Sequence, residues 1–387
     1  LDLGIKDTKF LGYKDFSSKA KIVKILRNAK EIKKAVSGDE VVVILDQTSF
    51  YAESGGQVGD IGFITKGKNI FEVLDTKNNG KVVLHIGRVK AGSFKKSDLI
   101  GAQVNVERRL AIARNHTATH LLQAALRKVL GNHVKQQGSL VSADRLRFDF
   151  THFKEISKED LARIEELVNV FVLANQKLNT KELTLSQAKK NGALAFFGEK
   201  YGSKVRMVTI EDTSKELCGG THLQATGQIG LFKIIQEGSI AAGTRRIEAV
   251  TGTVAYKAIK NEENLLDEAL QILNTSADAL PVELQKKLNR IKELEKQLGA
   301  QKMDAAKNSI DSMISGAETI KDMKVITAVL EGADMDLLRK TTDIIKQKVN
   351  GAVIALGSKN QGKALLILAA TLDLCDKGID VSKMIRE

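Results

Sequence analysis

Cysteine, proline and aromatic residues are scarce in this sequence of 387 residues, which has two cysteines, one proline and no tryptophan. Two cysteines, Cys218 and Cys375, are too few for a disulfide-stapled secreted scaffold, so we expect free thiols in a reducing, cytoplasmic compartment. No apolar run approaches the roughly 18 to 20 residues that span a bilayer, and the first residues lack the basic and apolar regions of a signal peptide. The composition excludes a secreted mini-protein, and we expect no membrane partner.

The length allows two to three folded domains, at about 150 residues per domain. A net charge of +13 favours an anionic partner, although charge alone does not distinguish nucleic acid from an acidic surface. The chain begins with Leu1 rather than methionine. We therefore expect it to be a piece of a longer protein.

Residues 1–106 contain short apolar runs, such as 41–45 and 81–86, which are separated by glycine and Asn-Gly turns. This pattern predicts a small β-barrel. The segment 50–60 (FYAESGGQVGD) is rich in glycine, which permits positive φ and the close approach of a ligand or another backbone segment; a plain loop is the alternative.

Residues 107–255 combine helical and strand patterns, which predicts a mixed α+β domain. Strong helix formers fill 107–130, and Gly131 is placed to end that helix. Alternation over 145–150 predicts a strand, and Ser157 can cap a second helix. Further strands are predicted at 205–210 and 229–235.

Residues 256–310 are rich in Lys, Glu and Leu, and leucine or isoleucine recurs at helical spacing, which predicts a helical hairpin linker. Pro281 can open its second helix, because the first turn does not need that N–H. Apolar runs around a predicted helix at 336–349 make residues 311–387 a small α/β domain. The predicted fold class is therefore α+β, with a barrel, a mixed domain, a helical linker and a small α/β domain.

Two pairs of metal-ligating residues share the same spacing. His116 and His120 lie four residues apart, so both imidazoles project from one side of the long helix. Cys218 and His222 repeat the spacing across two glycines. This set of four residues suits one zinc ion. Exposed histidines and an inert buried cysteine are the alternative for either pair alone. A zinc site closed by all four residues would be structural, whereas metal-water catalysis needs a free position, which would require that His222 not bind.

Five motifs together resemble the alanyl-tRNA synthetase family: FYAESGGQVGD (50–60), RNHTATHLL (114–122), FGEKY (197–201), ELCGGTH (216–222) and GTRRIEAVTG (243–252). The resemblance covers nearly the whole chain. It implies the C-terminal half of such an enzyme, with an editing domain at 107–255 and a C-terminal tRNA-binding domain, of the kind called C-Ala or DHHA1-like, at 311–387. The ATP-dependent alanylation domain has no counterpart here. The family's glycine-rich tail is also missing, so we expect the last domain to be incomplete.

The resemblance implies hydrolysis of serine or glycine wrongly attached to tRNA(Ala), because a pocket for alanine rejects close analogues by only about 1–3 kcal/mol. It assigns zinc ligation, one Zn²⁺ per chain, to the four residues above, and editing and substrate discrimination to Thr119 and Gln136. Helix back-bonding for Thr119 and a solvated loop amide for Gln136 are the alternatives without the family. The expected partner is tRNA(Ala), bound at its aminoacylated 3′ end and its elbow, with Arg245 and Arg246 contacting phosphates. Homodimerisation through the last domain is a further expectation.

Two other functions stay open on the sequence. One is a free-standing trans-editing protein of the AlaX type, which is built around the same motif pairs. The other is a zinc-stabilised tRNA-binding module without catalysis, in which the metal closes the fold. The helical linker and the last domain favour the synthetase fragment over a protein of the AlaX type.

Overall fold

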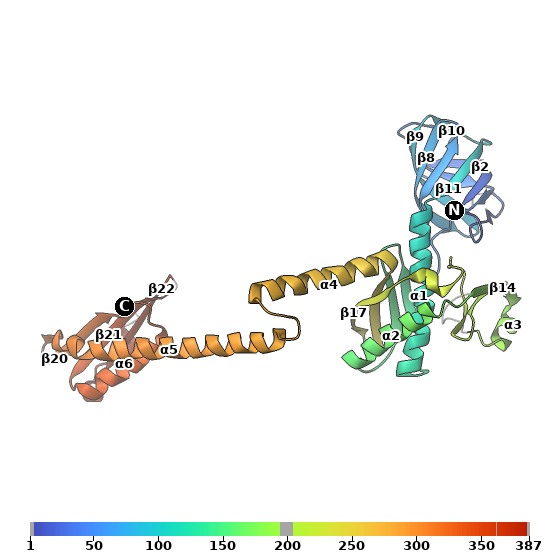
Figure 1. The fold of residues 1–387 in the computed structure, drawn as a ribbon. Coiled ribbons are helices and arrows are strands. Elements are labelled where there is room, and N and C mark those ends of the chain that lie inside the picture. The colour runs from blue at the N-terminus through green and yellow to red at the C-terminus, as the bar shows by residue number, and fades with distance from the viewer. Residues whose placement is uncertain (1–3, 194–203, 361, 385–387) are drawn as a thin grey trace. The chain divides into compact units, whose positions relative to one another are not determined.

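The computed structural model describes residues 4–193, 204–360 and 362–384, and its chain divides into two compact units, 1–264 and 265–387 (Figure 1). Each unit is described by itself. Helix α4, Gly252–Leu273, runs through the boundary between them. The motif at 197–201 lies outside the described residues.

The first unit begins with a closed barrel of six strands, which confirms the barrel expected from the short apolar runs. The strand order is β11-β7-β8-β9-β5-β2, and β11 pairs back to β2. The strands are β2 Ser17–Arg27, β5 Glu40–Leu45, β7 Gly62–Lys66, β8 Asn69–Asn79, β9 Val82–Ala91 and β11 Leu99–Val104. Their inward side chains, among them Ile22, Val43, Ile64 and Phe71, form a buried core.

Short strands extend this barrel at its margins. Strand β3, Lys30–Glu31, continues the sheet beyond β2, and β1, Lys9–Phe10, pairs in parallel with β6, Gln47–Thr48. A separate antiparallel pair joins β4, Lys34–Val36, to β10, Ser93–Lys95.

Helix α1, Val106–Leu130, follows the barrel directly. Asn105 caps it by accepting a hydrogen bond from the Arg108 amide, and Gly131, with φ of 115°, ends it as the sequence predicts. Helix α1 packs with α2, Lys158–Leu173, against an antiparallel sheet in the order β12-β13-β18-β17. These strands are β12 Gln136–Val141, β13 Leu146–Thr151, β17 Phe232–Ala241 and β18 Thr244–Thr251.

One predicted strand is displaced. The sequence favours a strand over 229–235, but the chain forms a 3₁₀ turn η1, Thr226–Ile229, and β17 begins only at Phe232. Gly230 lies between them with φ of 75°, a conformation that interrupts an extended strand. The prediction for these residues is therefore wrong at its start.

A smaller three-stranded antiparallel sheet carries the second ligand motif. It comprises β14, Leu178–Thr184, β15, Lys204–Ile210, and β16, Ser214–Leu217, and its order follows the chain. Helix α3, Leu185–Lys190, begins with a capping box between Thr184 and Gln187. Cys218 follows β16 immediately, so this sheet determines where the CGGTH loop starts.

The second unit starts with the end of α4 and the long helix α5, Leu280–Ser315, where Pro281 occupies the first turn as expected. Helix α5 continues past the predicted end of the linker at 310, because Ile310 packs into the core of the last domain. The leucines and isoleucine of its apolar row are exposed: Leu284, Leu288, Ile291, Leu294 and Leu298.

The last domain is a four-stranded sheet in the order β19-β20-β21-β22, with α6, Met335–Lys348, packed against it. The strands are β19 Glu318–Ile320, β20 Met323–Val329, β21 Ala352–Asn360 and β22 Lys363–Ala370, and β20 and β21 run in parallel. Short helices α7, Leu372–Cys375, and α8, Val381–Met384, follow. Among the described residues, no helix is both long and apolar enough to cross a membrane. The architecture is mixed α/β; the domain boundaries at 106, 255 and 310 stay predictions.

Candidate metal centre

Helix α1 buries a series of polar side chains, which are Arg109, Asn115, His116, Thr117, Thr119, His120 and Gln123. Polar groups removed from water cost free energy unless they find partners, so such a series on one helix marks a built site rather than a simple packing surface. Asn115 shows how tightly the helix is fixed. Its amide donates to the Ser142 carbonyl at 2.9 Å and accepts from the Thr251 hydroxyl at 2.7 Å.

The four predicted metal ligands converge. Their ligand atoms all lie within 4.8 Å of one another, although Cys218 stands 98 residues beyond His120 in the sequence. Cys218 Sγ lies 3.3 Å from both His116 Nε2 and His222 Nε2. The rings of His116 and His120 stack with centroids 5.5 Å apart, and the His222 ring lies 4.4 Å and 4.9 Å from them. The two motif pairs thus form one cluster that could hold a metal ion.

The spacing and bonding of the cluster fit zinc. Tetrahedral bonds of zinc to nitrogen and sulfur place neighbouring ligand atoms about 3.3–3.6 Å apart, close to the two distances from Cys218 Sγ. His120 Nε2 is buried without a hydrogen-bond partner among the described residues. A metal ion would satisfy this nitrogen. His116 and His120 are buried, and Cys218 and His222 are half-buried.

Each histidine is oriented by a hydrogen bond at Nδ1, which leaves its Nε2 for the centre of the cluster. His116 Nδ1 lies 2.7 Å from Gln57 Oε1, and His120 Nδ1 lies 2.5 Å from Glu216 Oε2. His222 Nδ1 is 3.4 Å from the Thr117 hydroxyl. Partners of this kind fix the tautomer and direction of metal-binding imidazoles.

The CGGTH loop is held from both sides. Gly220 lies so close to helix α1 that a Cβ at this position would overlap the His116 ring, whereas Gly219 faces open space. The Tyr13 hydroxyl donates to the Gly219 carbonyl at 2.7 Å. Arg206 stacks on the Tyr13 ring and donates to the carbonyls that flank Gly219 at 3.0 Å and 2.9 Å. Three successive loop carbonyls are thereby fixed, which positions the thiolate.

The electrostatics of the cluster favour a thiolate. Burial alone would raise the pKa of the Cys218 thiol, but the adjacent His116 and His222 imidazoles outweigh it and hold that pKa well below its ordinary value. Burial lowers the pKa of His222 to about 3, which keeps this ring neutral. Burial also opposes protonation of His120, but the Glu216 carboxylate and Cys218 raise its pKa to about 10. The Cys218 thiolate and the neutral His222 imidazole are donors that zinc accepts, whereas His120 has to release a proton before its Nε2 can bind the ion.

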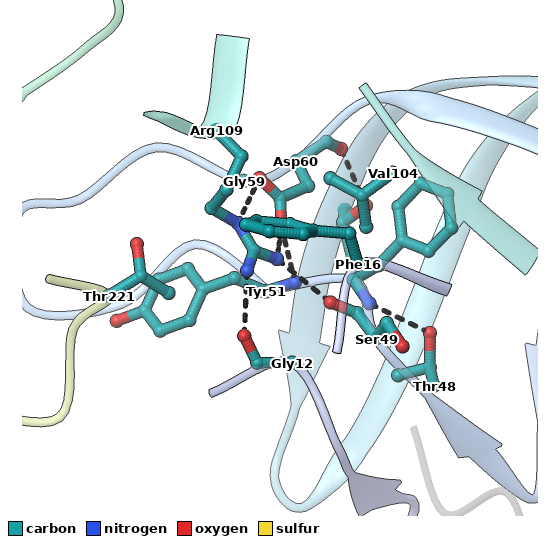
Figure 2. A network of polar contacts seen from close by, with 12 residues as sticks. Gly12, Phe16, Thr48, Ser49, Tyr51, Gly59, Asp60, Val104, Arg109 and Thr221 are labelled. Carbon is teal, nitrogen blue, oxygen red and sulfur yellow. Dashed lines mark hydrogen bonds and ion pairs between the residues drawn. The ribbon is translucent and has the colours of Figure 1, made fainter. Parts of the chain in front are cut away.

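The barrel is joined to α1 beside this cluster by a buried ion pair. Figure 2 shows Arg109 reaching Asp60, with both carboxylate oxygens 2.9 Å from Arg109 Nε. The same guanidinium donates to the carbonyls of Gly12 and Ser49, each at 2.8 Å. Asp60 belongs to the glycine-rich segment, which also supplies Gln57. The segment is therefore not a plain loop, because it connects the barrel to the metal cluster.

The other predicted site residues make their hydrogen bonds to residues other than the four ligands. Thr119 Oγ1 donates to the Asn115 carbonyl at 2.8 Å, which is helix back-bonding, and Gln136 Nε2 donates to Ser139 Oγ at 3.2 Å. Arg246 forms a paired contact with Asp149 at 2.6 Å and 2.8 Å, and Arg245 a similar one with Glu237. Phosphate binding by either arginine would require exchange of a carboxylate partner, and these roles stay predictions.

Sequence reasoning missed the residues that orient the histidines. Gln57 accepts from the Thr221 amide at 2.9 Å and donates to the Thr221 hydroxyl at 2.9 Å, so it links both ligand pairs. Glu216 accepts a further hydrogen bond from Ser214 at 2.7 Å. Both residues stand inside motifs that the sequence singled out. Two signals in the sequence could have indicated these roles. Gln57 is a polar residue among glycines, and Glu216 is an acid two positions before Cys218.

Comparison with protein families gives two matches. Residues 3–108 match the family described as tRNA synthetases class II (A). Residues 205–248, which include Cys218 and His222, match the threonyl and alanyl tRNA synthetase second additional domain. Together with the fold and the ligand cluster, these matches define a relative of the class II aminoacyl-tRNA synthetases.

Comparison with curated proteins identifies more specific relatives within this class. The chain is 44% identical to the alanine--tRNA ligase of Acetivibrio thermocellus over 389 residues, covering 100% of this chain and 44% of that protein. It is 42% identical to the alanine--tRNA ligase of Clostridioides difficile, where the match covers 98% of this chain and 44% of that protein. It is 43% identical to the alanine--tRNA ligase of Shewanella loihica, where the match covers 96% of this chain and 42% of that protein. The chain belongs to the alanyl-tRNA synthetase family, and it spans less than half the length of these relatives.

Proposed function

We propose that this chain hydrolyses the ester bond that joins a wrongly attached serine or glycine to tRNA(Ala). The observation that carries the proposal is the convergence of His116, His120, Cys218 and His222 on one point, in a chain of the alanyl-tRNA synthetase family. Cys218 and His222 are less buried than the two helix ligands, so we propose that an aminoacylated 3′ end approaches from their side.

Hydrolysis adds one water across the ester: the hydroxyl bonds to the carbonyl carbon, and the ribose oxygen leaves with a proton. A bound zinc ion would polarise the carbonyl or hold the aminoacyl end. The protein's own contribution is orientation. Gln57 and Glu216 direct two imidazoles, and Tyr13 and Arg206 fix the loop that carries the thiolate, so the ligand set is arranged before substrate arrives.

Discrimination between serine and alanine would rest on buried polar groups. A pocket that hydrogen-bonds the serine hydroxyl leaves those groups unpaired when alanine binds, which costs about 1–3 kcal/mol for each group. Thr119 and Gln136 are the residues we propose for this role, and the half-buried Gln136 amide already makes a hydrogen bond to a hydroxyl, that of Ser139. This argument does not cover glycine, which carries no hydroxyl.

The test is deacylation of Ser-tRNA(Ala) beside Ala-tRNA(Ala). We expect hydrolysis of the seryl ester and sparing of the alanyl ester. Cys218→Ala should lose this activity together with bound metal. Cys375→Ala is the matched control, because Cys375 is an exposed free thiol outside the cluster, and it should keep both. Equal or absent hydrolysis of the two esters by the wild type would contradict the proposal.

The presence of four protein ligands supports one alternative function. Four protein ligands describe a closed structural zinc site, which would suit a tRNA-binding module without catalysis. Removal of metal separates the two functions. A protein that keeps its fold and tRNA binding but loses deacylation supports the editing function, whereas global unfolding supports the structural one.

A further inference from the structure

We propose that the lysine face of the barrel, defined by Lys19, Lys21, Lys34 and Lys95, binds the phosphate backbone of tRNA. The inference rests on the proposed function, since it assigns a second contact surface for the same substrate. It starts from a like-charge contact within the barrel.

Lys34 and Lys95 are paired directly across the antiparallel strands β4 and β10. The next pair in the register, Ala35 and Phe94, is buried in the barrel core. Since side chains alternate along a strand, both lysines must point outward, with Cβ atoms about 4.5–5.5 Å apart. Like charges directly opposite one another destabilise a sheet unless an anion screens them.

Three acidic groups near Lys34 and Lys95 form ion pairs with other cations. Asp98 is buried and pairs with Lys66 at 2.5 Å. Glu31 contacts Lys96 at 3.0 Å and Lys24 at 3.4 Å, and Asp39 pairs with Arg27. In the described part of the chain, Lys34 and Lys95 form no salt bridge of their own. Lys95 still interacts electrostatically with Asp98, which is already paired with Lys66. Much of the positive charge of the lysine pair therefore stays available to an outside anion.

The positive surface continues onto strand β2. Lys19 and Lys21 are exposed, whereas Ala20 and Ile22 between and after them face the core, so both lysines project outward. The chain beyond β10 lies against this strand, because the Ser97 amide donates to the Ile22 carbonyl at 2.8 Å. Lys19 and Lys21 form no salt bridge among the described residues. All four lysines are thus exposed on the outer surface of the barrel.

The chemistry of this face suits a phosphodiester backbone. Lysine ammonium groups on an open surface neutralise phosphates but do not form the bidentate contacts that read base edges. In Figure 1 strand β10 lies towards the end of the barrel that is away from α1. The four lysines belong to the barrel and none is a metal ligand, so loss of this face should raise KM for deacylation without changing kcat.

The experiment measures tRNA(Ala) binding by the whole chain at several salt concentrations. Each phosphate contact contributes about 0.7–0.9 to the slope of log K against log salt. Lys34→Ser combined with Lys95→Ser should therefore lower the slope by about 1.4–1.8 and weaken binding about 40-fold near 0.1 M salt. The control combines Lys77→Ser with Lys81→Ser, which removes the same charge at the opposite end of β9, and should leave slope and affinity unchanged.

The outcomes are distinct. An unchanged slope in the Lys34/Lys95 variant, or an equal fall in the control, overturns the inference while tRNA binding itself stands. Absence of tRNA binding by the wild type overturns the proposed function as well. Lysine-dependent binding to phosphatidylserine vesicles without binding to tRNA also overturns the inference, because it identifies a lipid surface as the partner. An unfolding midpoint in urea that is equal to or above wild type shows that the variant is folded.

Discussion

Arg109 of helix α1 and Asp60 of the glycine-rich segment form an almost fully buried salt bridge, with 2% and 1% of their side chains exposed. The guanidinium also binds two backbone carbonyls, and Asp60 Oδ2 accepts from the Tyr51 amide at 2.7 Å. The pair satisfies nearly every polar group that it buries. It thereby fixes the barrel to the helix that carries His116 and His120.

Asp60→Ala should destabilise the protein by about 3–5 kcal/mol, because it leaves the Arg109 charge buried without a counter-ion. Urea unfolding of the first unit measures the change. Glu72→Ala is the matched control: Glu72 pairs with Arg88 at 2.8 Å on an exposed surface, where the loss should stay below about 1 kcal/mol. Equal losses of unfolding free energy in the two variants would show that burial of the Arg109–Asp60 pair does not determine its contribution to stability.

Gly220→Ala and Gly219→Ala form a pair of adjacent substitutions with different expected results. A methyl group at Gly220 would overlap the His116 ring, whereas at Gly219 it enters open space. We expect Gly220→Ala to weaken zinc binding about tenfold or more, and Gly219→Ala to change it little. Competition with a chromophoric chelator gives both affinities. Similar affinities for the two variants would mean that the close approach of the loop to His116 is not required.

Glu216→Gln should weaken metal binding about tenfold, and Glu216→Ala about 100-fold, because the carboxylate orients His120 and supplies negative charge beside the ion. The cobalt-substituted protein provides a second readout, since loss of His120 orientation alters its visible spectrum. Glu159→Gln, an exposed acid in the first turn of α2, is the control and should match wild type. Wild-type affinity in Glu216→Ala would exclude the orienting role.

His85 predicts a pH dependence of barrel stability. It is buried, with Nε2 2.8 Å from the Thr48 hydroxyl and Nδ1 3.0 Å from the Val43 carbonyl. Burial lowers its pKa from 6.5 to about 4, although the Val43 carbonyl opposes the shift. The unfolded chain therefore binds a proton first as pH falls below 6.5. Stability is fully present above that pH and is lost progressively towards pH 4.

Between pH 7.5 and 4.5 this single group should lower the free energy of unfolding by about 2.5 kcal/mol. His85→Gln keeps hydrogen-bonding capacity but does not titrate, and all other groups are common to both proteins. The difference in unfolding free energy between wild type and His85→Gln should therefore shift by that amount over this range. A difference independent of pH would show that His85 does not titrate differently in the two states.

The local features of the site could be predicted from sequence because they depend on neighbouring residues. Helix α1 is specified by strong helix formers between the Asn105 cap and Gly131, and the four-residue spacing places His116 and His120 on one side. The strand predicted from 229 failed at its start because the conformation of Gly230 outweighed the apolar pattern.

The sequence by itself determined the helix, the barrel strands and the two ligand pairs, since propensity and periodicity act over a few residues. Only the tertiary structure decided that the pairs meet, and that Gln57 and Glu216 orient the rings, because these contacts join segments 59 to 102 positions apart. The carboxylate partners of Arg245 and Arg246, and the facing charges of Lys34 and Lys95, were likewise set by strand register. Register depends on how whole sheets pack, and no local pattern specifies it.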